Sequence, residues 1–110
     1  MASYSIHLYP AGLQTIDTAT LTGAGNYLPL GTPTVNGTRI YKITNASTVS
    51  VTFAWNGIVV DVLPAGSFFL LDVSSNRENN NILEIPGGTQ TSVAGAAGTG
   101  LVYLSTFYAG

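Results

Sequence analysis

The sequence predicts an all-β protein, a single antiparallel β-sandwich with jelly-roll or related Greek-key topology. Runs rich in Val, Ile, Tyr, Phe and Thr alternate at short spacing with Gly, Pro and Asn, which is typical of sandwiches and barrels. No stretch has the apolar repeat of an amphipathic helix. The length of 110 residues suits one core and leaves no room for a second, so residues 1–110 are expected to form one domain.

The expected strands follow one another closely, with short turns between them. From the composition of each run, they are predicted at residues 4–9, 13–17, 27–30, 38–44, 49–55, 58–63, 67–73, 82–85, 89–94 and 100–108. Residues 1–12 have the alternative interpretation of an extended amino-terminal arm. Residues 18–25 and 74–81 are predicted to be loops.

Residues 49–63 predict a β-hairpin. Apolar side chains occupy every second position from Val49 to Trp55, as in a strand with one face in the core. Asn56-Gly57 follows at once, and this pair tolerates the positive φ angles of a type I′ turn. Farther upstream, Pro29 lacks a backbone donor, so the strand at 27–30 is predicted to lie at a sheet edge or in an arm.

The last predicted strand, residues 100–108, is apolar at both parities. Such a strand is buried on both sides. Either it is central in the sandwich with loops above it, or its second face meets a neighbouring subunit. The alternative fold is an immunoglobulin-like sandwich. It lacks its usual cysteine pair here, but Trp55 suits the buried position which that fold gives to a tryptophan.

The chain is poor in charge. Charged residues make up 7% of it, against roughly 25% in an ordinary soluble domain. The net charge of −2 and the lack of a basic cluster argue against nucleic-acid binding. One interpretation is a neutral surface of Thr, Ser and Asn. The other, which we favour, is that apolar surface is buried against partner subunits, because large exposed apolar patches usually mark interfaces.

The residues offer little for catalysis or metal binding. There is no cysteine and a single histidine, His7, so no Cys- or His-based metal site is expected. No cofactor motif is present, because the glycine-rich segments lack the lysine and the following helix of a phosphate loop. An enzyme would need two carboxylates, or His7 and a hydroxyl, to converge in a cleft. We expect no enzymatic activity.

Other absences bear on location and ligands. No apolar run approaches the ~20 residues that span a bilayer, and the amino terminus lacks the pattern of a secretion signal, so no membrane association is expected. A carbohydrate-binding module, as part of a receptor-binding particle, is an alternative function. It predicts an exposed aromatic row of Tyr27, Tyr41 and Trp55.

Several segments, taken in their order and spacing, resemble small β-sandwich virion proteins of tailed double-stranded-DNA bacteriophages, of the head decoration or cement type. They are residues 53–57 (FAWNG), 63–67 (LPAGS), 71–72 (LD), 85–90 (IPGGTQ) and 95–108 (GAAGTGLVYLSTFY). The likeness covers roughly residues 36–110. It implies a protein that works by contact, and no catalytic residue is carried over.

The resemblance implies a virion protein that stabilises the head by binding across capsomers. Its partners would be the major capsid protein or other virion subunits, with copies of itself as a dimer or trimer. A neck, collar or tail position is the alternative place on the particle. The residues expected at the interface lie in the arm and the last strand: Tyr4, Ile6, Leu8, Tyr9, Tyr103, Phe107 and Tyr108.

Overall fold

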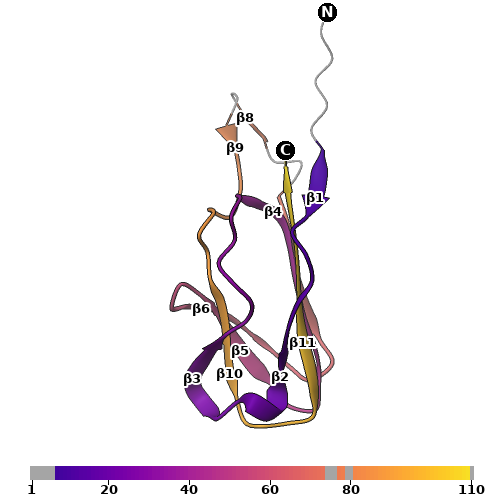
Figure 1. Ribbon diagram of the computed structural model, residues 1–110, viewed down its shortest axis with the longest axis vertical. Coiled ribbons are helices and arrows are strands. Elements are labelled where there is room, and N and C mark those ends of the chain that lie inside the picture. Colours follow the sequence, from indigo (N-terminus) through magenta and orange to yellow (C-terminus); the bar gives the residue numbers. More distant parts are fainter. Residues whose placement is uncertain (1–6, 74–76, 79–80, 110) are drawn as a thin grey trace, which may run out of the picture.

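The computed structural model describes residues 7–73, 77–78 and 81–109. Two antiparallel sheets pack as a sandwich, which confirms the predicted fold class (Figure 1). The first sheet has the order β1 (Leu8–Pro10), β11 (Gly100–Ala109), β4 (Thr38–Ser47) and β7 (Phe68–Asp72), and β2 (Gln14–Asp17) also pairs with β11. The second has the order β3 (Gly23–Pro29), β10 (Thr91–Gly95), β5 (Val51–Trp55) and β6 (Ile58–Leu63).

The connectivity is that of a jelly roll. The strands pair as a long ribbon folded back on itself, with β1 and β2 beside β11, β3 beside β10, β4 beside β7, and β5 beside β6. Successive pairs along this ribbon belong to alternate sheets, so rolling it up buries one face of each sheet. The immunoglobulin-like alternative is therefore wrong. Trp55 lies half-buried at the end of β5.

The core lies between the two sheets. Phe53 on β5 and Phe69 on β7 come from opposite sheets, and their ring centroids are 5.2 Å apart. Burial of each large apolar side chain contributes roughly 1.5–3 kcal/mol to stability. The buried apolar cluster consists of Leu21, Leu30, Tyr41, Ile43, Val51, Phe53, Leu63, Ile85, Val93, Val102 and Leu104.

Two local predictions are confirmed. Asn56 and Gly57 have φ angles of 49° and 84°, as a type I′ turn between β5 and β6 requires. Strand β3 lies at the edge of the second sheet, as Pro29 indicated. In the first sheet β11 lies between β4 and the pair β1 and β2. Its side chains Val102, Leu104 and Thr106 are buried in the core, whereas Leu101, Tyr103, Ser105 and Phe107 are half-buried on the opposite face.

The loop predicted at residues 18–25 is wrong. Thr18–Thr20 form a short 3₁₀ helix, η1, and Asp17 caps it by accepting a hydrogen bond from the Ala19 N–H at 2.9 Å. Strand β3 then begins at Gly23. The Gly and Thr residues of this segment have no strong strand preference of their own, which is why a loop was predicted. Pairing with β10 nevertheless holds the segment as a strand.

Two other segments also differ from the prediction. The strand predicted at 82–85 is reduced to β9 (Asn81–Ile82), which pairs with β8 (Arg77–Glu78), and to an isolated bridge between Ile85 and Thr38. The rest of the loop predicted at 74–81 lies outside the described residues. In the predicted arm, residues 8–10 pair with β11 as β1. No helix in the described part of the chain is long and apolar enough to cross a membrane.

Candidate interaction surface

The first sheet presents apolar side chains on its outer face. Because core-facing residues alternate with residues that face away, every second side chain of β4, β7 and β11 lies on this face. The register aligns them in rows: Tyr103, Thr44 and Phe68; Ser105, Lys42 and Leu70; Phe107, Ile40 and Asp72. We define the outer face by the apolar members of these rows and Lys42, namely Ile40, Lys42, Phe68, Leu70, Tyr103 and Phe107.

Phe68 and Leu70 are the most exposed apolar residues of the outer face. They are 60% and 53% exposed. The Lys42 ammonium lies 5.3 Å from the centroid of the Phe68 ring, within the range of a cation–π contact. This contact covers only part of the ring, so most of the apolar area of both side chains is available to a partner.

Four of the predicted interface residues meet at one end of the first sheet. Leu8 and Tyr9 lie on β1, 39% and 43% exposed, and β1 pairs with the part of β11 that contains Phe107 and Tyr108. The Tyr9 and Tyr108 ring centroids are 5.7 Å apart. Figure 1 shows β1 beside the carboxyl end of β11, so this cluster forms one end of the molecule. Phe107 and Tyr108 are half-buried.

The other predicted interface residues are less informative. Tyr103 is half-buried on β11, in the same row of the outer face as Phe68. Tyr4 and Ile6 lie outside the described residues. The sequence analysis missed Phe68 and Leu70, because residues 68–71 are apolar at both parities. Asp72 is the signal that identifies the solvent side, since it shares their parity and a charged residue seldom faces a core.

A second group of exposed apolar side chains lies on β6, the edge strand of the second sheet. Ile58, Val59 and Val62 are 74%, 55% and 53% exposed. The chain runs directly from β6 into β7 through residues 64–67. Both strands lie at sheet edges, so the exposed apolar residues of β6 and β7 lie on two edge strands that one short connection joins.

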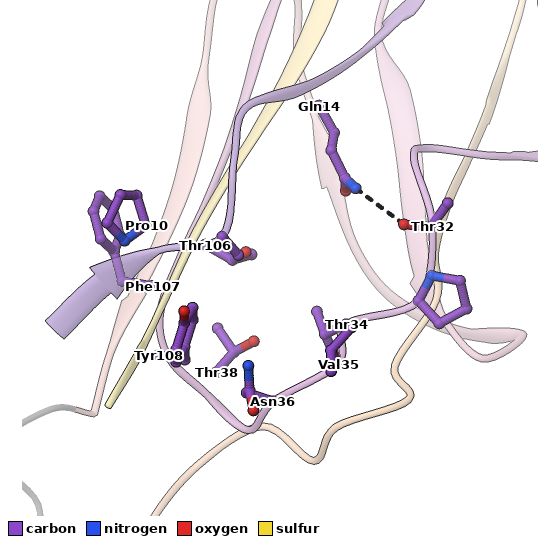
Figure 2. Close-up of a pocket in the computed structure, with 12 residues that line it drawn as sticks. Pro10, Gln14, Thr32, Thr34, Val35, Asn36, Thr38, Thr106, Phe107 and Tyr108 are labelled. Carbon is purple, nitrogen blue, oxygen red and sulfur yellow. Dashed lines mark hydrogen bonds between the residues drawn. The ribbon is translucent and has the colours of Figure 1, made fainter. Parts of the chain in front are cut away.

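A cavity of about 340 Å³ lies between the inner side of β11 and the segment before β4. Figure 2 shows Thr106, Tyr108 and Thr38 on one side of it and the chain through Thr34 and Asn36 on the other. At its margin the side chains of Gln14 and Thr32 point toward one another and share a hydrogen bond at 3.4 Å (Figure 2). None of its lining residues carries a formal charge, and Tyr108 is the one ionisable side chain among them.

The acidic residues and the histidine of the described chain do not form a metal-binding cluster. No group of three or more His, Asp or Glu residues in it is placed to hold a metal. Asp17 caps η1, and the Asp61 carboxylate accepts a hydrogen bond from the neighbouring Val62 N–H at 2.8 Å. His7 is exposed, and its ring lies 6.3 Å from that of Tyr9. These contacts are local and structural.

The aromatic row predicted for a carbohydrate-binding module is absent. Tyr41 is 2% exposed, and its ring packs edge-on against Trp55 at 5.1 Å. Its hydroxyl shares a 2.7 Å hydrogen bond with Thr91, and burial raises the pKa of this tyrosine above its usual value of 10.0. Core packing therefore uses two of the three aromatic residues that the row required.

No protein-family model matches this chain, and no curated protein matches it either.

Proposed function

We propose that this protein is a structural subunit of a bacteriophage virion, a decoration or cement protein that stabilises the head by binding across capsomers. The observation that supports it most is the outer face, where Phe68 and Leu70 are 60% and 53% exposed in a chain with only 7% charged residues. The choice of a bacteriophage head as the particle is based on the sequence resemblance to head decoration proteins. The partners are the major capsid protein or other virion subunits, and copies of the chain itself.

The mechanism is burial of apolar area at the contact. Aromatic residues dominate the energetics of protein interfaces, and Tyr103, Phe107 and Phe68 lie on the outer face as candidate anchors. A specific interface of ordinary size buries roughly 1,200–2,000 Å² in total. A subunit that binds only the assembled shell stabilises that shell by mass action.

A sedimentation experiment tests the proposal. The purified protein is mixed with heads, and separately with tails, of candidate tailed bacteriophages, and the protein that sediments with each is measured. We expect binding to heads, weakened at least ~10-fold in the double variant Tyr103→Lys/Phe107→Lys. Val35→Lys is the control, because Val35 is 91% exposed and lies outside the outer face. Circular dichroism checks that each variant is folded.

Each result of this experiment is decisive for the proposal. Binding to tails alone would assign the protein to the tail instead of the head. Binding to neither particle, by a folded protein, would contradict a role in the virion. Equal weakening by Val35→Lys would show that the outer face is not the contact.

A further inference from the structure

The chain contains two Asn-Gly pairs, Asn36-Gly37 and Asn56-Gly57. Asparagine is one of the thermolabile residues of proteins. It loses its amide nitrogen when the backbone nitrogen of the next residue attacks the carbon of its side-chain amide. Glycine in that next position favours the attack, because it has no Cβ atom beside the attacking nitrogen. The two pairs have the same local sequence, so a difference in their reactivity must come from the fold.

Asn56 is attached to Gln90 through both its backbone and its side chain. Its backbone N–H donates to the Gln90 carbonyl at 2.9 Å, and its side-chain oxygen accepts from the Gln90 N–H at 2.8 Å. The side-chain amide therefore cannot turn toward the Gly57 nitrogen without losing a hydrogen bond.

The backbone of Asn56 is also unsuited to the attack. Its φ angle of 49° lies in the left-handed region, as the type I′ turn requires. In that conformation a side chain and the following backbone nitrogen lie on opposite sides of the Cα–C bond. The Gly57 nitrogen can reach the amide carbon only when the turn opens, and opening disturbs the pairing of Trp55 with Ile58.

Asn36 has none of these restraints. It is exposed, and no described residue shares a hydrogen bond with its side chain or with the Gly37 N–H. Asn56 is the only described residue other than glycine with a positive φ angle, so Asn36 lies outside the left-handed region. Figure 2 shows the Asn36 side chain at the cavity. Its amide carbon is therefore free to approach the Gly37 nitrogen.

We propose that Asn36 is a site of spontaneous deamidation and that the fold protects Asn56 from the same reaction. The Gly37 nitrogen forms a bond to the amide carbon of Asn36. The bond from that carbon to the amide nitrogen breaks, and this nitrogen leaves as ammonia with the proton of the Gly37 N–H. Water then opens the cyclic imide at either carbonyl, which gives aspartate or isoaspartate at position 36. Nothing is oxidised or reduced.

The modification changes the charge at the cavity. None of the lining residues carries a formal charge, and one carboxylate added to the formal net charge of −2 gives −3. The Glu84 carboxyl group already occupies the place where a side chain of residue 37 would lie. The new carboxylate is thus one residue from a position that already holds a negative charge. The reaction needs only water, so this inference does not depend on the proposed function.

Peptide mapping tests the proposal. The folded protein is incubated in mildly alkaline buffer, digested with trypsin and measured by mass spectrometry. The three Lys and Arg residues place Asn36 in peptide 1–39 and Asn56 in peptide 43–77. We expect the mass increase of an amide-to-acid exchange at Asn36, located by fragmentation. Its rate should exceed that at Asn56 at least ~10-fold, because two hydrogen bonds must open before Asn56 reacts.

The unfolded protein is the matched control. In concentrated guanidinium chloride both pairs are released from the fold, and their rates should agree within ~3-fold. A difference in rate that persists in the unfolded chain would show that the fold is not its cause. In the folded protein, a faster reaction at Asn56 would overturn the proposal. So would an unmodified Asn36 over a period in which the unfolded chain reacts at both pairs.

Asn36→Gln tests the position of the modification. Glutamine keeps the amide but has a longer side chain, so a cyclic imide of the same size cannot form. The mass increase of peptide 1–39 and the acidic form of the protein in ion-exchange chromatography should both be lost. If this variant still gives both at the wild-type rate, the reaction lies at another residue and the assignment to Asn36 is wrong.

Discussion

Asn45 illustrates how a single polar residue ties the sandwich together. It is fully buried near the end of β4, and its amide group donates to the Val49 carbonyl at 2.8 Å and to the Leu63 carbonyl at 3.0 Å. Its side-chain oxygen accepts from the backbone N–H and hydroxyl of Ser47. One side chain thus joins the ends of β4 and β6 to the turn before β5, and a buried polar group of this kind is stabilising only while its partners are in place.

We predict that Asn45→Ala lowers the free energy of unfolding by about 2–4 kcal/mol, because the Val49 and Leu63 carbonyls lose a donor inside the protein. Urea denaturation at low protein concentration measures the change. Asn36→Ala is the control, since Asn36 is exposed, and its effect should stay within about 0.5 kcal/mol. Equal stability of the two variants would show that water replaces the lost contacts.

Among the elements, the β5–β6 hairpin depends on the backbone of its turn. Gly57 has a φ angle of 84°, and a Cβ atom added there would meet nothing within 4 Å. A side chain at position 57 would therefore meet no steric clash, and only the positive φ angle disfavours it. Asn56 adds a contact to the second sheet, because its side-chain oxygen accepts from the Gln90 N–H at 2.8 Å.

Gly57→Ala should therefore lower the free energy of unfolding by about 1–2 kcal/mol, which is the cost of a left-handed conformation for a residue with a Cβ atom. Gly57→Asn should lose less, because asparagine tolerates this conformation better. Thermal and urea unfolding of both variants measure the difference. If Gly57→Asn lowers the free energy of unfolding as much as Gly57→Ala does, the φ angle of residue 57 is not the cause of the destabilisation.

The sequence was sufficient to predict elements whose signals are local. The alternation from Val49 to Trp55 and the Asn56-Gly57 pair placed the β5–β6 hairpin, and Pro29 placed an edge strand. Residues 18–25 were misread, because their Gly and Thr residues have little strand preference and are held by distant partners. Pairing of β3 with β10 joins residues more than 60 positions apart, and no local pattern reports such a contact.

At the scale of the molecule, the candidate surface was only partly predictable. Low charge indicated an interface, and the predicted residues at 8–9 and 107–108 do meet in space. The exposed pair Phe68 and Leu70 was missed, because a strand that is apolar at both parities does not reveal which side faces the core. Its orientation is set by pairing with β4, which is information about the whole sheet.

The orientation of β7 predicts that two phenylalanines of this fold contribute very differently to its stability. Phe53 is fully buried where the two sheets meet, whereas Phe68 is 60% exposed. Phe53→Ala should lower the free energy of unfolding by about 3–5 kcal/mol, because it opens a cavity between the sheets. Phe68→Ala deletes the same atoms and should cost less than about 1 kcal/mol in the dilute monomer. Urea titrations of the two variants provide the comparison, and similar losses would mean that the outer face of the first sheet is covered within the monomer itself.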